Sequence, residues 1–197
     1  MIKAVIFDCF NVLIRDATKH LVEQIGEADP AKRQEFSAVT HAVDKGIISD
    51  TEAATTQSEL LGISVEEFID IRNKGEIRNE PLIEYIRSLK GKYKLMMVSN
   101  IVSRERLDSR FLPGQLDDLF EAVIASGEVG YIKPQPEIYV IAAERLGVLP
   151  EECVMIDDIP EFCEGARDVG MQAIQFTSNE QAISDLEALI DRGEKRD

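Results

Sequence analysis

The sequence has few of the residues that build zinc sites and disulfide frameworks. Its three cysteines, Cys9, Cys153 and Cys163, form no Cys-x-x-Cys pair, and its two histidines stand in no Cys/His cluster. An odd number of scattered cysteines indicates reduced, buried thiols of an intracellular protein. The missing Cys/His cluster argues against a zinc site.

Long apolar runs and positive charge are also scarce. No stretch approaches the ~20 apolar residues that cross a bilayer, and the first apolar run leaves no room for a signal peptide, so we expect a cytoplasmic protein. With 22 Lys and Arg against 37 Asp and Glu, the formal net charge is −15. This charge argues against nucleic acid or an anionic membrane as partner, but not against a small anionic substrate. It leaves monomer and homodimer equally open.

Four short apolar runs end at, or lead towards, polar or charged residues. Runs without alternation suit strands buried on both faces of a parallel sheet. Ligands of such sheets lie outside the carboxyl ends of the strands, so the residues after the runs should meet at one edge. The runs are 4–7 before Asp8, 95–98 before Ser99 and Asn100, 122–125 leading to Lys133, and 154–156 before Asp157 and Asp158.

The chain after the first run reads as helices from about 14 to 78, and from 79 onward helices alternate with strands. Alternation indicates βαβ units and a parallel sheet. We therefore predict an α/β protein with a Rossmann-like core (residues 1–14 and 79–197) and a small inserted helical cap (15–78). The last residues, 193–197, are expected to fray. Capping boxes are expected at Ser49 with Glu52 and Ser64 with Glu67, glycine stops at Gly46 and Gly62, helices at 81–89, 104–110, 137–146, 161–169 and 180–190, and strands at 94–98, 122–125, 154–156 and 172–176.

Asp8, Asp157 and Asp158 pose an electrostatic problem if they meet. A carboxylate at the end of a buried strand is costly, and one lysine cannot balance three of them. A hard divalent cation can, and Mg²⁺ is expected because it combines a few carboxylates with water and a substrate phosphate. Alternatively, these acids only cap the segments that follow them, which requires no metal.

Ser99, Asn100 and Lys133 are weaker signals individually. Ser-Asn is compatible with a simple turn. As part of a site, its hydroxyl, amide and backbone N–H groups would hold phosphoryl oxygens. Lys133 precedes Pro134 in a segment stiffened by two prolines, so it enters from a rigid loop.

Four segments of the chain, which are given at the end of this paragraph, resemble the four motifs of the haloacid dehalogenase (HAD) superfamily and occur in the same order as those motifs. The resemblance implies a Rossmann-like core with a cap inserted after the first motif. It also implies Asp8 as the nucleophile, Ser99 and Asn100 as phosphate-binding residues, and Lys133 as the residue that steadies nucleophile and phosphate. The segments are 7–13 (FDCFNVL), 98–100 (VSN), 132–139 (IKPQPEIY), and 156–158 (IDD) with 164–166 (EGA).

The same resemblance implies a magnesium site and a reaction. Asp158 would bind Mg²⁺ directly and Asp157 through water, with Asp8 and the backbone carbonyl of Phe10 completing the protein ligands. The implied reaction is hydrolysis of a small phosphorylated metabolite through an aspartyl-phosphate on Asp8. The cap would exclude water and select the leaving group.

Three positions depart from the usual motifs. HAD phosphatases usually carry an acid/base Asp two residues after the nucleophile, where this chain has Phe10, and such assistance is typically worth about 10²–10⁴-fold. Ile159 and Phe162 stand where Ser and Asn often support the metal ligands. Weakened catalysis is therefore expected.

Three functions stay open, in this order of preference. The first is a magnesium-dependent phosphatase, with leaving groups that need little protonation, such as anomeric sugar phosphates or acyl phosphates. The second is a catalytically impaired binding or regulatory protein, which Phe10, Ile159 and Phe162 favour. The third is a metal-independent 2-haloacid dehalogenase, which Phe10 fits but the paired acids do not, and for which the cap offers no evident halide-binding arginine. A dinucleotide-binding protein is disfavoured because no Gly-x-Gly-x-x-Gly follows the first run.

Overall fold

The computed structural model describes residues 1–194, and a five-stranded parallel sheet lies at its centre. The strand order is β3-β2-β1-β4-β5, and the central β1 pairs with both β2 and β4 along its whole length. The α/β class with a Rossmann-like core is confirmed, with strand bounds close to those predicted. The strands are β1 (Ala4–Phe7), β2 (Lys94–Ser99), β3 (Ala122–Ala125), β4 (Cys153–Asp157) and β5 (Gln172–Gln175).

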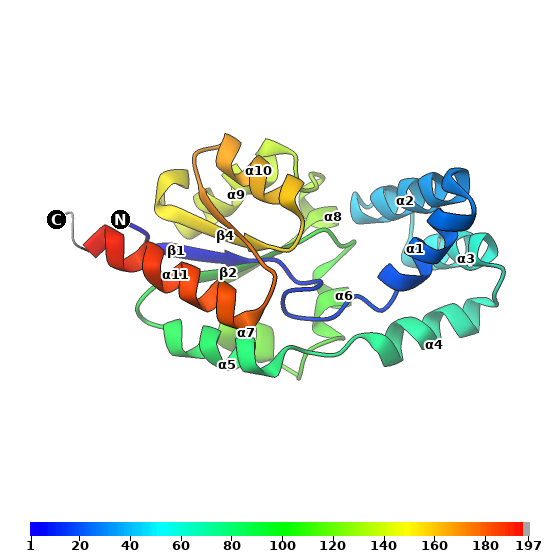
Figure 1. Cartoon of the computed structure of the whole chain (residues 1–197), viewed down its shortest axis with the longest axis horizontal. Coiled ribbons are helices and arrows are strands. Elements are labelled where there is room, and N and C mark those ends of the chain that lie inside the picture. Colours follow the sequence, from blue (N-terminus) through cyan, green and yellow to red (C-terminus); the bar gives the residue numbers. More distant parts are fainter. Residues whose placement is uncertain (195–197) are drawn as a thin grey trace.

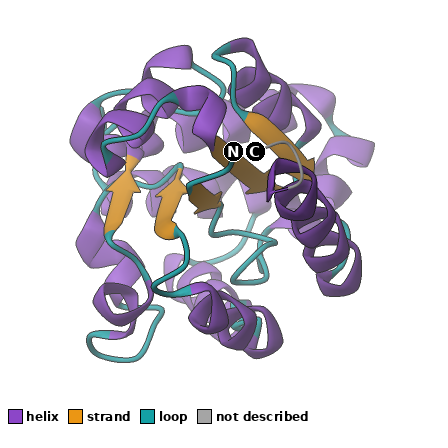
Figure 2. Ribbon diagram, turned by 90° about the vertical axis from the view of Figure 1, so that its left-hand side faces the viewer, coloured by secondary structure: helices purple, strands orange, loops and turns teal. Residues whose placement is uncertain are grey.

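Helices cover both faces of the sheet (Figure 2). Those predicted from periodicity are present, but α7 and α8 were not predicted, because helices this short show no periodic pattern. Helix α11 continues to Glu194, and residues 195–197, where fraying is also expected, lie outside the described residues. The helices after the cap are α5 (Glu80–Leu89), α6 (Arg104–Asp108), α7 (Gln115–Leu119), α8 (Ser126–Val129), α9 (Pro136–Leu146), α10 (Pro160–Asp168) and α11 (Asn179–Glu194), with a 3₁₀ turn at Pro150–Glu152.

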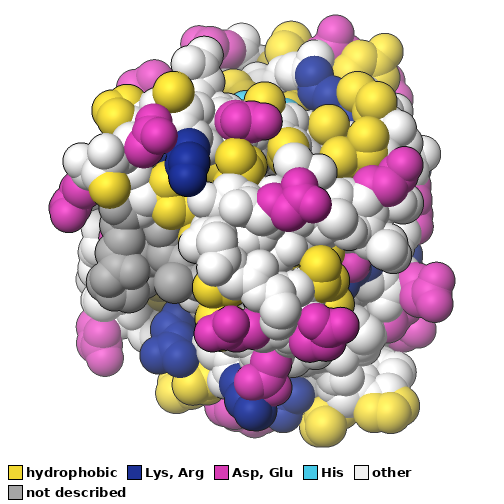
Figure 3. Space-filling view, turned by 90° about the vertical axis from the view of Figure 1, so that its right-hand side faces the viewer, with side chains coloured by type: hydrophobic (Ala, Val, Ile, Leu, Met, Phe, Trp, Pro, Cys, Tyr) yellow, Lys and Arg dark blue, Asp and Glu magenta, His cyan; other side chains and the backbone are white. Residues whose placement is uncertain are grey.

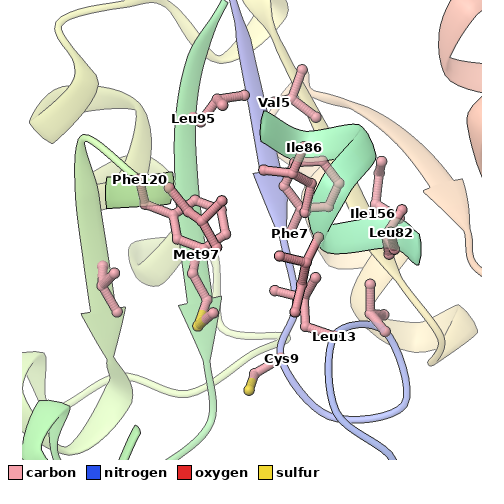
Figure 4. Close-up of a cluster of buried hydrophobic side chains, with 14 of the residues drawn as sticks. Val5, Phe7, Cys9, Leu13, Leu82, Ile86, Leu95, Met97, Phe120 and Ile156 are labelled. Carbon is pink, nitrogen blue, oxygen red and sulfur yellow. The ribbon is translucent and has the colours of Figure 1, made fainter. Parts of the chain in front are cut away.

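Strand β1 is buried on both faces, as its unbroken apolar run predicted. Val5 and Phe7 pack in one cluster with residues of α5 and α11, and Figure 4 shows them beside Ile86 of α5. Ala4 and Ile6 belong to a second cluster, with residues of α9 and α10. Each large side chain buried in this way contributes about 1.5–3 kcal/mol. Because both faces are covered, only the strand ends can carry a site.

The segment between β1 and α5 is helical, as predicted, and lies beyond the carboxyl end of β1 (Figure 1). The Ser49 capping box forms in both directions, whereas at Ser64 the hydroxyl accepts from the Glu67 N–H. Gly62 ends its helix in the left-handed conformation, with φ of 72°. The four helices are α1 (Lys19–Ala28), α2 (Pro30–Asp44), α3 (Asp50–Leu61) and α4 (Val65–Gly75).

Two backbone hydrogen bonds join the chain where it leaves the core and where it returns. The Arg15 N–H donates to the Ile77 carbonyl at 2.9 Å, and the Asn79 N–H donates to the Leu13 carbonyl at 2.8 Å. This short ribbon coincides with the predicted boundaries at 14/15 and 78/79. The division into two domains stays a prediction, and "the cap" below means residues 15–78.

The surface at the cap end carries many acidic side chains (Figure 3), in keeping with the net charge of −15. Within residues 1–194, no helix is both long enough and apolar enough to cross a membrane. The cytoplasmic location stays a prediction.

Candidate active site

Asp8, Lys133 and Asp157 meet at the carboxyl end of the sheet. Lys133 Nζ lies 2.6 Å from Asp8 Oδ1 and 2.6 Å from Asp157 Oδ2. The pairing of Phe7 with Ile156 brings the ends of β1 and β4 level, and the lysine enters from the loop between α8 and α9. The three side chains are 8%, 1% and 0% exposed for Asp8, Lys133 and Asp157. The strand-end argument therefore located this cluster correctly.

Asp158 brings a third carboxylate to the same place. One oxygen each from Asp8, Asp157 and Asp158 lie within 4.8 Å of one another. Lys133 supplies one positive charge against three negative ones, and the remaining donors are all oxygen. Such a set fits a hard divalent cation such as Mg²⁺. The predicted meeting of the three acids is confirmed, and the binding of a metal by them stays a prediction.

Burial sets the charges of the cluster. Removal from water raises the pKa of Asp8 to about 7, although the charge of Lys133 acts to lower it and that of Asp157 raises it further. Burial alone would lower the pKa of Lys133, but the carboxylates of Asp157 and Asp8 outweigh it and raise that pKa. Lys133 is therefore charged at neutral pH. Asp8 requires additional positive charge nearby to be fully ionised.

The side chains of Ser99 and Asn100 differ in their hydrogen bonding. Ser99 Oγ is completely buried and has no hydrogen-bond partner among residues 1–194, a costly state that a phosphoryl oxygen would relieve. The Asn100 side chain is already engaged: Nδ2 donates to the Lys133 carbonyl at 3.0 Å, and Oδ1 accepts from the Lys133 N–H at 2.8 Å. Asn100 thus holds the Lys133 loop, which leaves the predicted phosphate contact to its backbone N–H.

This arrangement agrees with a family comparison. A family model for haloacid dehalogenase-like hydrolases matches residues 2–170. The chain belongs to this family. The resemblance of the four motifs to HAD proteins is thereby confirmed.

Similar proteins include phosphatases. YhcW of Bacillus subtilis (strain 168), whose name marks its phosphatase activity as unproven, is 27% identical over 187 residues, or 88% of this chain and 83% of YhcW. The phosphorylated carbohydrates phosphatase of Thermotoga maritima is 30% identical over 111 residues, or 56% of this chain and 49% of that protein. This chain therefore spans about half of the second relative.

A solved structure of similar fold contains magnesium and phosphate. HAD family enzyme BT-2542 of Bacteroides thetaiotaomicron, in complex with magnesium and inorganic phosphate, has a TM-score of 0.72 and 22% identity. The match covers 91% of this chain and 96% of that one. At 22% identity, this similarity shows that the two proteins share a fold and nothing more.

Ile159 and Phe162 replace the usual serine and asparagine of the HAD motifs, and each makes a different contact with the charged cluster. The Ile159 N–H donates to Asp157 Oδ1 at 3.0 Å, so a backbone group supports this carboxylate without a serine side chain. The Phe162 ring lies over Lys133 Nζ, 5.1 Å from ring centroid to nitrogen, a favourable cation–π contact. Both positions therefore support the charged cluster.

Phe10, the third departure from the HAD motifs, packs against a cation. The Arg110 guanidinium carbon lies 5.6 Å from the centre of its ring, and Arg110 Nε lies 2.7 Å from Glu76 Oε2. The phenyl ring fills the position of the usual acid and cannot move a proton. If protonation is needed, it has to come from elsewhere.

A cavity of about 150 Å³ lies between the core and the cap, and Phe10 and Asn100 help to line it. Sequence reasoning missed most of the charged residues of its walls, because nothing in their local pattern distinguishes them from surface charges. They are Asp16, Asp44, Asp50 and Glu76, with Arg72, Arg106 and Arg110.

Arg72 of α4, which sequence reasoning did not single out, lines this cavity. Its Nη1 lies 3.3 Å from Asp50 Oδ1, and its guanidinium carbon lies 5.6 Å from the centre of the Phe68 ring. Asp50 also pairs with Arg106 at 2.9 Å. Arg72 and Arg106 are thus both paired with Asp50, although Arg72 Nε has no hydrogen-bond partner among the described residues.

Proposed function

We propose that this protein is a magnesium-dependent phosphatase that hydrolyses a small phosphorylated metabolite through an aspartyl-phosphate on Asp8. The observation that carries the proposal is the meeting of Asp8, Asp157 and Asp158 around the single ammonium group of Lys133. Two buried carboxylates and a half-buried third beside one lysine are unfavourable unless a cation joins them. Buried groups with perturbed pKa values are typical of catalytic sites.

Four protein groups would hold the ion. In the proposal, Asp8, Asp158 and the Phe10 carbonyl bind Mg²⁺ directly, and Asp157 binds it through water. When bound, Mg²⁺ supplies positive charge that screens the phosphate dianion and stabilises the transition state. BT-2542, whose fold this chain shares, was crystallised with magnesium and inorganic phosphate, which supports this choice of ion and ligand.

Asp8, Lys133 and Ser99 each have a separate role in the proposed reaction. Asp8 Oδ attacks phosphorus while the bond from phosphorus to the leaving oxygen breaks, and water then attacks the aspartyl-phosphate to release phosphate. Lys133 favours the ionised form of Asp8 and lessens its repulsion from the substrate. The hydroxyl of Ser99, which is unpaired among the described residues, is suited to hold a phosphoryl oxygen.

The cavity between core and cap indicates the size of the leaving group. Its volume of about 150 Å³ is roughly five times the ~30 Å³ that one molecule occupies in liquid water. A leaving group of a few carbon atoms is therefore expected. The phosphorylated carbohydrates phosphatase of Thermotoga maritima supports a substrate of this kind. The net charge of −15 supports a small molecule over nucleic acid or an anionic membrane.

A regulatory protein is the second candidate, and Phe10 is the observation that favours it. The phenyl ring occupies the position of the usual proton donor and packs on Arg110, so an acid is missing from the core side of the site. The dehalogenase alternative is weaker, because it gives no account of three converging acids and the cap arginine is already paired with Asp50.

The test is hydrolysis of p-nitrophenyl phosphate with and without Mg²⁺. We expect magnesium-dependent release of nitrophenol by the parent and none by Asp8→Asn, with Asp168→Asn, an exposed substitution, behaving as the parent. Thermal unfolding of each variant shows that it is folded. Equal background release by the parent and Asp8→Asn would favour the regulatory role, and chloride release from 2-chloropropionate would favour the dehalogenase.

A further inference from the structure

The cap places an acid that the mechanism above does not use in the wall of the cavity between core and cap. Asp44 is the last residue of α2, and it lines the same cavity as Phe10 and Asn100. A carboxylate is disfavoured at the C-terminus of a helix, where the helix dipole is negative. Its position is therefore not explained by the stability of α2.

Asp44 is held against the core, although it belongs to the cap. Ser126 Oγ, at the start of α8, donates to the Asp44 carbonyl at 2.5 Å and accepts from the Ile101 N–H at 2.9 Å. The turn after α2 also lies close to the core, because a Cβ on Gly46 would be 3.1 Å from the Gly127 carbonyl oxygen. These contacts fix the end of α2 beside the strand ends.

The surroundings of Asp44 favour its neutral form. Burial raises the pKa of Asp44 to about 8, with the charge of Lys133 lowering it and that of Asp8 raising it. Among the side chains that the structure describes, none forms an ion pair with Asp44. The other charged groups around it have their own partners: Arg72 and Arg106 pair with Asp50, Arg110 with Glu76, Asp16 accepts from Thr18, and Glu128 of α8 accepts from the Arg104 N–H.

We propose that Asp44 is the general acid of the phosphoryl transfer, and that it reaches the site from the cap in place of the acid that Phe10 cannot supply. This proposal rests on the proposed phosphatase function. Two observations on the geometry carry it: Asp44 lines the same cavity as Phe10, and the bond from Ser126 Oγ to the Asp44 backbone carbonyl fixes the end of α2 there.

Asp44 gives one proton to the leaving group and regains one from the attacking water. As Asp8 attacks phosphorus and the phosphorus–oxygen bond to the leaving group breaks, the Asp44 carboxyl gives its proton to the departing oxygen, and an alcohol leaves. The Asp44 carboxylate then takes a proton from the water that attacks the aspartyl-phosphate. Phosphate leaves, and Asp8 and Asp44 return to their starting forms.

The test compares leaving groups. An acid is needed to expel an alkoxide but hardly to expel p-nitrophenolate or a carboxylate. We therefore expect Asp44→Asn to lose about 10²–10⁴-fold in kcat on alkyl phosphates and to stay near the parent on p-nitrophenyl phosphate and acetyl phosphate. Asp44→Glu, which keeps a proton, should recover part of the alkyl activity. A dependence of kcat on leaving-group basicity that is the same in the parent and Asp44→Asn overturns the proposal.

Controls separate this outcome from other failures. Asp70→Asn, an exposed substitution in the same cap, should behave as the parent on every ester, and thermal unfolding should show Asp44→Asn folded. If Asp44→Asn slows all esters equally, Asp44 only positions the cap and the proposal is wrong. If the parent itself hydrolyses none of these esters with Mg²⁺, the phosphatase function has failed, and the role of Asp44 fails with it.

Discussion

Asn100 and Lys133 are joined by a reciprocal pair of hydrogen bonds. The side-chain amide of Asn100 donates to the Lys133 carbonyl, and its oxygen accepts from the Lys133 N–H. The backbone of the lysine is thereby fastened to the end of β2. Its Nζ then reaches the carboxylates that end β1 and β4. The position of this buried cation therefore depends on an uncharged side chain from a third strand.

Removing the Asn100 side chain should lower turnover. Asn100→Ala loses both bonds and frees the loop that carries Lys133, and a misplacement of about 1 Å can cost about 10²-fold in rate. We expect kcat to fall by roughly 10–100-fold. Asn73→Ala, an exposed substitution in α4, serves as control in steady-state kinetics. Unchanged turnover in Asn100→Ala would show that Lys133 holds its place without this pair.

Lys133→Met should destabilise the protein in a magnesium-dependent way. The substitution leaves Asp8 and Asp157 buried without a cation, and breaking a buried ion pair costs about 3–5 kcal/mol. The loss should be smaller in millimolar Mg²⁺, because the ion replaces the missing charge. Urea unfolding with EDTA and with Mg²⁺ measures both values, and exposed Lys74→Met is the control. The same loss in both buffers would argue against a metal site.

Gly165→Ala in α10 should displace the loop that carries Lys133 and Pro134. A Cβ at this position in α10 would lie 2.8 Å from the Pro134 carbonyl oxygen and 2.9 Å from Pro134 Cβ. Overpacking of this kind costs typically about 1–3 kcal/mol, and Pro134 follows Lys133 directly, so turnover should fall too. Urea unfolding and kinetics test this, with exposed Glu164→Ala on the same helix as control. Parental stability in Gly165→Ala would mean that α10 moves aside freely.

Asp44→Asn should stabilise the protein more at high pH than at low pH. The pKa of Asp44 is raised from 3.8 to about 8 in the folded protein. From about pH 4 to about pH 8 the unfolded chain therefore releases a proton that the folded chain retains, so Asp44 progressively lowers stability as pH rises. Asparagine carries no such proton. Unfolding measured at about pH 5 and about pH 8 should show a widening difference between variant and parent, and a constant difference would contradict the pKa shift.

Much of the fold could be predicted from local pattern. The run 4–7 has no alternation because β1 is covered on both faces, and the acids after the runs meet because parallel strands end at one edge. The helix ends at Ser49 and Gly62 follow from capping interactions within a few residues. Helices α7 and α8 escaped prediction because they are too short for a period to show.

The sequence by itself determined which strands are buried, because short apolar runs without alternation indicate burial on both faces. It also determined that Asp8, Lys133, Asp157 and Asp158 converge, because these residues follow runs that form parallel strands ending at one edge. Only the tertiary structure decided what Asn100 holds, which acids pair with the arginines of the cavity, and that Asp44 faces it. Ser126 meets Asp44 across 82 positions of sequence. Such contacts depend on how the cap docks on the core, and no local pattern of apolar or capping residues carries that information.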